Sequence, residues 1–399
     1  MANKQELMDK GEQLLYKTYN RFPVVFEKGN GVYLYDCDQQ EYLDFGAGIA
    51  VAGLGYHDPD FSKALKDQVD LLLHTSNLFY NQPSIDAAEK LLKVSGMEKV
   101  FFTNSGTEAI EGAFKIAKRY GFNKDGNHDH EIIAMKQSFH GRSLGALSLT
   151  GNDHYQEPFK PLIPGVKFAC FNDLTSVKEL VNEKTCAIIL ETIQGEGGIY
   201  PADVSFLKGI KELCETHDML LILDEIQCGM GRCGNMFAWQ NYGIEPDVMT
   251  VAKALGNGVP IGAFLAKGKA ATAMVPGDHG TTYGGNPFVC AAAAKVLDLF
   301  KEKKIPDHVK EISSYLEQKL DELVESCEVV SARRGMGLMQ GLEFQIPVAS
   351  IVKHALIEEH LVLISAGSQV IRFVPPLIIE QEHVDKMIEK LKRSINASL

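Results

Sequence analysis

The sequence predicts an α/β fold with a mainly parallel, seven-stranded sheet in a large domain and a smaller α+β C-terminal domain. Three observations predict this fold. Short apolar runs alternate with helical patterns from about residue 60 to 300, the order changes to helices and hairpins beyond Lys301, and the last helical pattern is amphipathic. Alternating strands and helices favour right-handed βαβ units, and 399 residues suffice for two to three domains of about 150 residues each.

The N-terminal part of the sequence predicts a helix followed by a β-hairpin. Residues 4–20 have amphipathic helical spacing, and residues 31–35 and 41–45 are apolar and aromatic runs on either side of a polar turn. We expect this segment, residues 1–58, to pack with the smaller domain.

The large domain is expected over residues 59–300 and the small domain over residues 301–399. Helices lie between most of the large-domain strands, which are predicted at 100–103, 132–135, 166–170, 186–190, 219–223, 248–252 and 262–266. The small domain is predicted to contain a helix, a hairpin (328–333 and 338–344), a helix (348–360), short strands (361–365 and 370–374) and a final helix.

Charge and composition exclude several classes of protein. The chain has 40 Lys and Arg residues and 52 Asp and Glu residues, so its net charge is −12. It has no block of basic residues that could bind nucleic acid or an anionic membrane. No apolar run approaches the roughly 20 residues that span a bilayer, and the N-terminus lacks the apolar segment of a secretory signal. The eight cysteines show no metal-binding spacing, so we expect reduced thiols, no metal and a cytoplasmic location.

Two motifs point to chemistries that their surroundings argue against. Residues 229–234 match the GxGxxG pattern of dinucleotide-binding proteins, but no clear helix follows them. Residues 141–145 match the GxSxG elbow of serine hydrolases with Ser143 as nucleophile, but the preceding strand ends several residues too early. Both remain as distant alternatives.

A third motif combines a strand, a small-residue turn and a helix. Ser105 and Glu108 have the spacing of a capping box after the strand that ends near Thr103, and Gly106 allows a ligand to approach the backbone closely. The free N–H groups and the positive end of the helix predict a phosphate site, although a well-capped helix without a ligand is the simpler alternative.

An acid and a lysine are predicted at the same edge of the sheet as this phosphate site. Asp224 ends one buried strand, and Lys253 follows the next. A structural ion pair is the alternative, but burial lowers the pKa of a lysine and makes it a nucleophile. Pyridoxal phosphate needs such a lysine, an acid beside its ring nitrogen and a helix N-terminus for its phosphate.

With these residues the chain resembles the class III pyridoxal-phosphate-dependent aminotransferases of fold type I over nearly its whole length. Each motif alone is modest evidence, whereas all of them in order are highly specific. The motifs are Asn104-Ser-Gly-Thr-Glu-Ala109, Phe139-His-Gly-Arg142, Gln194-Gly-Glu-Gly-Gly198, Asp224-Glu-Ile-Gln227, Ala252-Lys-Ala-Leu-Gly256, Thr281-Thr-Tyr-Gly-Gly-Asn-Pro287 and Ile371-Arg-Phe-Val-Pro-Pro376.

The resemblance implies two catalytic residues. Lys253 would form the Schiff base with pyridoxal 5'-phosphate and, once released, would act as general base and acid for the proton shift. Asp224 would bind the ring nitrogen and keep it protonated, so that the ring withdraws electrons from the substrate.

The resemblance also implies further contacts to the cofactor. Ser105, Gly106 and Thr107 would hold the phosphate, Phe139 would stack on the ring, and Gln227 would meet its 3-oxygen. In this family Thr282 reaches the phosphate of the neighbouring subunit, so the resemblance implies a homodimer with shared active sites.

For the substrates, the resemblance implies a role for two arginines and a glutamate. Arg142 would bind a substrate carboxylate through its planar fork. Glu196 and Arg372 resemble the family's gate: they pair while the amino donor is bound, and Glu196 moves away when glutamate brings its α-carboxylate to Arg372. The alternatives are a solvated loop arginine and a surface glutamate.

Residues 48–51 and 74–80 resemble the members of the class that act on N2-acetylornithine. Ornithine enzymes tend to have a tyrosine where this chain has Ile49. An isoleucine at this position fits an acylated amine, because that group carries no charge. We therefore expect ping-pong transfer of the δ-amino group of N2-acetylornithine to 2-oxoglutarate, giving N-acetylglutamate 5-semialdehyde and glutamate, in arginine biosynthesis. The alternatives are succinylornithine, ornithine, 4-aminobutyrate or succinyldiaminopimelate as donor, or an aminomutase.

Overall fold

Seven strands form the largest sheet of the structure, a computed structural model that describes residues 3–399. The strand order is β4-β12-β11-β10-β7-β5-β6, and β12 runs antiparallel to both of its neighbours, whereas the other neighbouring pairs are parallel. The sequence prediction of a mainly parallel, seven-stranded sheet is thereby confirmed. The strands are β4 (Lys99–Thr103), β5 (Glu131–Met135), β6 (Val166–Ala169), β7 (Thr185–Glu191), β10 (Leu220–Asp224), β11 (Val248–Val251) and β12 (Gly262–Ala266).

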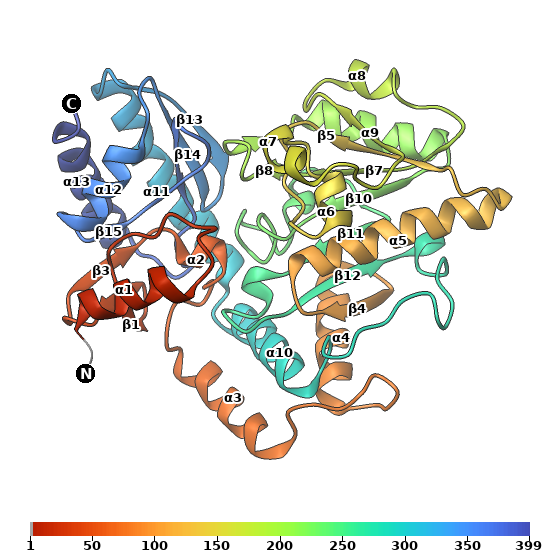
Figure 1. Ribbon diagram of the computed structural model, residues 1–399, viewed down its shortest axis with the longest axis horizontal. Coiled ribbons are helices and arrows are strands. Elements are labelled where there is room, and N and C mark those ends of the chain that lie inside the picture. The colour runs from red at the N-terminus through yellow and green to blue at the C-terminus, as the bar shows by residue number, and fades with distance from the viewer. Residues whose placement is uncertain (1–2) are drawn as a thin grey trace.

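Helices cover both faces of this sheet, which explains why its strands β7, β10, β11 and β12 are buried at every position. On β5, for example, Ile132 packs with α5 and α6 on one face, whereas Ile133 belongs to the cluster that includes α4, α9 and α10 on the other. The long helix α5 crosses the sheet in Figure 1. The helices of this part are α3 (Pro59–Leu71), α4 (Gln82–Ser95), α5 (Gly106–Asp125), α6 (Leu144–Leu149), α7 (Asp153–Gln156), α8 (Leu174–Lys178), α9 (Val204–Thr216) and α10 (Pro287–Glu302).

The two ends of the chain pack together, as the red and blue elements at the left of Figure 1 show. The predicted N-terminal hairpin is present, and β15 from near the C-terminus extends its sheet by pairing in parallel with β3. This sheet contains β1 (Phe26–Asn30), β2 (Tyr33–Asp36), β3 (Glu41–Asp44) and β15 (Leu361–Val362). A second sheet contains β13 (Val330–Met336), β14 (Met339–Phe344), β17 (Val370–Phe373) and β16 (Ile364–Ser365), and α11 (Ile305–Ser326), α12 (Ala349–Ile357) and α13 (Gln381–Asn396) complete this part.

Two helices are shorter than the sequence predicts. Helix α1 spans Lys4–Leu14 instead of residues 4–20, and α12 ends at Ile357 instead of residue 360. None of the α1 residues is buried, and Leu15 is already extended. Because most helical stability in proteins comes from packing, a helix without a buried face ends early. The division of the chain at residues 58 and 300 stays a prediction.

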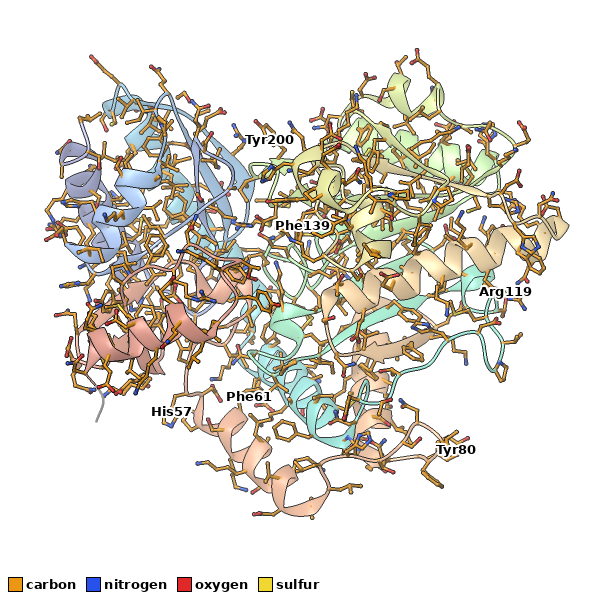
Figure 2. All side chains as sticks on the ribbon, viewed as in Figure 1. His57, Phe61, Tyr80, Arg119, Phe139 and Tyr200 are labelled. Atoms are coloured by element: carbon orange, nitrogen blue, oxygen red, sulfur yellow. The ribbon has the colours of Figure 1, made fainter. Side chains whose placement is uncertain are left out.

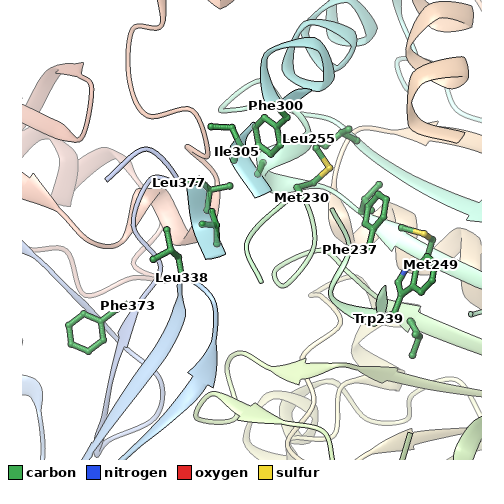
Figure 3. Packing of buried hydrophobic residues seen from close by; sticks show 14 of the residues in the cluster. Met230, Phe237, Trp239, Met249, Leu255, Phe300, Ile305, Leu338, Phe373 and Leu377 are labelled. Carbon is green, nitrogen blue, oxygen red and sulfur yellow. The ribbon is translucent and has the colours of Figure 1, made fainter. Parts of the chain in front are cut away.

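The core continues from the large sheet into the C-terminal part. Figure 3 shows Leu255 and Phe300 close to Ile305 and Leu377, and all four belong to one buried cluster. Beside them the fully buried Arg232 donates from Nη1 to the carbonyl oxygens of Leu338 (3.1 Å) and Pro375. A short hairpin, β8 (Ile193–Gln194) and β9 (Tyr200–Pro201), follows β7. Within residues 3–399, no helix is long and apolar enough to cross a membrane.

Candidate active site

Helix α5 begins at the carboxyl end of β4 with a capped and open N-terminus. The hydroxyl of Ser105 accepts a hydrogen bond from the N–H of Glu108 at 3.3 Å, as the capping pattern predicts. The carboxylate of Glu108 accepts a hydrogen bond from the backbone N–H of Asn104 (2.8 Å). In a capping box it would accept from the N–H of Ser105, so the donor here lies one residue earlier than expected. A Cβ atom at Gly106 would lie 3.0 Å from the side chain of Ile226, so glycine keeps this end of the helix accessible.

Asp224 lies at the end of β10 and accepts three hydrogen bonds. Its Oδ2 accepts from Nδ1 of His140 at 2.7 Å, and its Oδ1 accepts from the backbone of Ile226 (3.0 Å) and the hydroxyl of Thr250 (3.1 Å). Burial disfavours the charged form of His140, but the bond and the attraction to Asp224 outweigh burial and raise the His140 pKa. Asp224 is thus fixed in one orientation by its neighbours.

Lys253 follows β11, the strand paired in parallel with β10, so the two predicted groups do meet at one edge of the sheet. Its backbone is left-handed, with φ of 49°. Burial, assisted by the positive charge of Arg372, lowers the pKa of the Lys253 amine to about 8. The neutral, nucleophilic form of this amine is therefore far more abundant near neutral pH than in an exposed lysine, whose pKa is about 10.4.

These groups line one cavity of about 410 Å³, within the usual size range of cofactor and substrate sites. The structure brings eight of the predicted site residues together in its wall: Ser105, Gly106, Thr107, Phe139, Arg142, Asp224, Gln227 and Lys253. The ring of Phe139 lies near the centre of the molecule (Figure 2). Apolar neighbours such as Val51, Ile193 and Ile226 complete the lining.

The two predicted gate residues form an ion pair beside this cavity. Nη1 of the buried Arg372, on β17, donates to Oε1 of Glu196 at 2.6 Å and to Oε1 of Gln227 at 3.0 Å. Because Gln227 lines the cavity, the pair is one contact away from it. The guanidinium of Arg372 would be freed for another carboxylate if Glu196 moved away.

Arg142 and Thr282 have more exposed positions. The guanidinium of Arg142 lies over the ring of Tyr155, 3.9 Å from its centroid, and among the described residues it pairs with no carboxylate. Thr282 is exposed and is not part of the cavity wall. It is the one predicted cofactor contact that the single chain does not bring to the cavity.

Sequence reasoning missed three polar groups of the site. His140 and Thr250 bind Asp224, and the buried Glu191 accepts hydrogen bonds from the N–H groups of Phe139 and Gly195, both at 3.2 Å. Burial raises the pKa of Glu191 to about 7, which the nearby His140 opposes. Glu191 ends β7 as Asp224 ends β10, so the rule that strand ends carry site residues could have found it.

The comparisons with known proteins agree with this geometry. The family model described as "Aminotransferase class-III" matches residues 15–395. The chain belongs to the class III aminotransferases. It is 48% identical to the acetylornithine aminotransferase of Clostridium acetobutylicum over 382 residues, which is 96% of this chain and 98% of that protein.

Two solved structures extend the comparison. The ornithine aminotransferase of Toxoplasma gondii is 29% identical with a TM-score of 0.94, covering 100% of this chain and 96% of that one. The N-acetylornithine aminotransferase of Stenotrophomonas maltophilia is 37% identical with a TM-score of 0.84, covering 98% and 99%. The fold is therefore that of fold type I, the class uses pyridoxal 5'-phosphate, and this chain is an aminotransferase.

The GxSxG pattern at residues 141–145 and the GxGxxG pattern at residues 229–234 have structural roles in this aminotransferase. The hydroxyl of Ser143 bonds the carboxylate of Glu111 at 2.6 Å and the hydroxyl of Thr107 at 2.9 Å, so it binds a carboxylate and not the histidine of a hydrolase. The 229–234 glycines lead into a short 3₁₀ helix (Ala238–Asn241), not into the helix of a dinucleotide site.

A Ser143→Ala variant separates the aminotransferase from the hydrolase alternative. We expect amino transfer to fall by no more than about tenfold, because the substitution removes hydrogen bonds to Thr107 and Glu111 and no reacting group. Steady-state rates of amino transfer and of ester hydrolysis would be compared. Complete loss of activity in Ser143→Ala, with an active Lys253→Ala variant beside it, would contradict the assignment of roles.

Proposed function

We propose that this aminotransferase moves the δ-amino group of N2-acetylornithine to 2-oxoglutarate, giving N-acetylglutamate 5-semialdehyde and glutamate in arginine biosynthesis. The observation that carries the proposal is the arrangement of two arginines, Arg142 in the cavity wall and Arg372 beside the cavity. Arg142 is unpaired among the described residues, whereas Arg372 is paired with Glu196. This difference matches the charges of the two substrates.

N2-acetylornithine carries one carboxylate, and Arg142 would bind it. The acylated α-nitrogen has no charge and needs no acceptor, in agreement with Ile49 and the cavity-lining Val51. 2-Oxoglutarate carries two carboxylates, so it needs a second cation. Movement of Glu196 would release Arg372 for this purpose, and one cavity would then serve two substrates of different charge in turn.

The residues of the cavity fit pyridoxal 5'-phosphate. The open N-terminus of α5 with Ser105, Gly106 and Thr107 would hold the phosphate, and Thr282 would approach the phosphate of a partner subunit. Phe139 would stack on the ring, and Gln227, whose Oε1 already accepts from Arg372, would turn its amide N–H₂ toward the 3-oxygen. When bound, the group supplies an electron sink that acidifies the C–H bond next to the amino nitrogen.

Lys253 and Asp224 would perform the proton chemistry. The neutral Nζ of Lys253 would hold the cofactor covalently and, once displaced by the substrate amine, would take a proton from the substrate carbon and return it to the cofactor side. The carboxylate of Asp224, fixed by three donors, would accept a hydrogen bond from the protonated ring nitrogen and keep that proton in place. The hydrogen bond from Nδ1 of His140 to Oδ2 of Asp224 would stabilise the negative charge of that carboxylate.

A homodimer in the cytoplasm completes the proposal. Asn77 bonds the carbonyl of Gly284 at 2.9 Å and so joins two loops that carry large exposed apolar side chains. The exposed fractions are 87% for Leu78, 67% for Phe79, 97% for Tyr80 and 63% for Tyr283. Figure 2 shows Tyr80 at the edge of the molecule. Thr282 lies next to Tyr283, so a second copy that covers these loops would meet Thr282, and light scattering should give twice the mass of one chain.

The test is a pair of half-reactions followed by the absorbance of the bound cofactor. N2-acetylornithine should bleach the near-visible band of the purified protein, and 2-oxoglutarate should restore it. The proposed donor would be refuted if N2-acetylornithine did not bleach the band but ornithine, succinylornithine, 4-aminobutyrate or succinyldiaminopimelate did. Turnover without 2-oxoglutarate would indicate an aminomutase.

A further inference from the structure

The loop of residues 195–199, here called the gate loop, carries Glu196 between β8 and β9. The large sheet holds the beginning of this loop. Oε1 of Glu191 accepts the N–H of Gly195 at 3.2 Å, and the amide of Gln194 donates to the carbonyl of Lys136 at 2.9 Å. The start of the gate loop is therefore fixed relative to the large sheet.

The C-terminal part of the chain holds the other end of the gate loop through Arg334 on β13. Nε of Arg334 donates to the carbonyl of Gly198 at 2.8 Å, and its guanidinium lies over the ring of Tyr200, 4.0 Å from the centroid. Nη1 of the same group bonds Glu343 on β14 at 2.8 Å. Figure 2 shows Tyr200 next to the blue strands of this part. Arg334 thus connects the second sheet to the end of the gate loop.

The backbone at this end of the gate loop is strained. Ile199 has a φ of 59° and is fully buried, although a β-branched side chain disfavours this conformation. It packs against β14 so closely that a Cβ on Gly341 would lie 3.0 Å from its own Cβ. Strained backbone persists only where its surroundings fix it, so the contacts from β13 and β14 determine the conformation here.

We propose that Arg334 is a positioning residue that holds the gate loop in the conformation in which Glu196 pairs with Arg372, and so sets the preference between the two substrates. Glu196 lies two residues before Gly198, whose carbonyl Arg334 binds. Without this bond the strained loop relaxes, and Glu196 no longer covers Arg372. Arg372 is then available to a carboxylate at all times. The inference rests on the gate in the proposed function.

The test variant is Arg334→Met, which keeps an apolar stem of similar length but removes the charge and the donors. The matched control is Arg333→Met, because Arg333 is the preceding residue and pairs with Asp321 (2.6 Å) on α11, away from the gate loop. Hydrogen exchange of the peptide 195–201 would be measured without substrates, together with KM for the amino donor and for 2-oxoglutarate.

In Arg334→Met we expect faster exchange in residues 195–201 and a donor KM about five- to tenfold higher, because the donor would then meet the unpaired charge of Arg372. The KM for 2-oxoglutarate should not rise, because Arg372 is already free to bind its second carboxylate. Arg333→Met should change neither the exchange nor the donor KM, and Arg334→Lys, which keeps the charge without the fork, should lie between Arg334→Met and the unchanged protein. Unfolding midpoints establish that each variant is folded.

Unchanged exchange in a folded Arg334→Met variant would overturn the proposal, as would equal changes in both KM values. If Arg334→Met does not fold, Arg334→Lys alone decides, and an unaltered ratio of the two KM values in that variant would equally overturn it. If the unchanged protein rejects N2-acetylornithine, the proposed donor fails, but the exchange measurement and the KM of whichever ω-amine is accepted still decide the role of Arg334.

Discussion

Replacing Lys253 by alanine is expected to lower the rate of amino transfer by about four orders of magnitude or more. Lys253 contributes the sole amine among the described residues of the cavity wall, so no neighbour can take over covalent binding or proton transfer. The fold should survive, because alanine removes a buried cation whose charged form is disfavoured by burial. Single-turnover kinetics with N2-acetylornithine would measure the loss.

The lowered pKa of Lys253 predicts that the uptake of pyridoxal phosphate depends on pH. Because burial lowers its pKa to about 8, the neutral amine becomes more abundant as the pH rises toward 8, and the rate at which cofactor-free protein takes up pyridoxal phosphate should rise with it. Lys269→Ala is the control, since Lys269 pairs with Asp218 on the surface. A residual rate in Lys253→Ala within tenfold of the unchanged protein would show that another group does the chemistry.

Replacing Asp224 by asparagine is expected to slow both half-reactions by about a hundred- to thousandfold. Asparagine has nearly the same shape but no charge, so it cannot stabilise a proton on the ring nitrogen. One of its two terminal atoms is an N–H₂ group, which cannot accept from His140 or from Thr250 and Ile226. The charge and the fixed orientation of the side chain are lost together.

The same substitution should lower the pKa of His140. With the attraction to Asp224 removed, burial dominates, and the imidazole should stay neutral at pH values where it is charged in the unchanged protein. NMR titration of His140 would measure this shift beside the half-reaction rates. Asp218→Asn is the control, because Asp218 pairs with Lys124 and Lys269 at the surface. Unaltered half-reactions in Asp224→Asn would contradict its role.

Much of the fold could be predicted because strand and helix patterns are local. The seven strands of the large sheet agree with their apolar runs, and β10 and β11 are neighbours, which is what placed Asp224 and Lys253 at one edge. Helix α1 was overestimated because its amphipathic spacing says nothing of whether a partner surface exists, and its residues remain unburied.

The site was less predictable where its contacts join distant segments. His140 follows Phe139 in the sequence, but nothing local indicates that it binds Asp224, which lies 84 residues later. Arg334 and Arg333 are neighbours of the same type, and only the pleat of β13 sends one to Gly198 and the other to Asp321. Such assignments need the register of the strands, which the sequence pattern leaves open.

The parallel pairing of β3 with β15 has a consequence for how the protein is made. Residues 41–44 leave the ribosome long before their partner strand, residues 361–362, is synthesised. Until residues 361–362 are synthesised, β3 has no strand partner on this edge of the N-terminal hairpin. Arg372 on β17 is synthesised later still. Nascent chains are expected to need protection from aggregation until β15 emerges, and a truncation that removes residues 361–362 should destabilise the N-terminal hairpin as well.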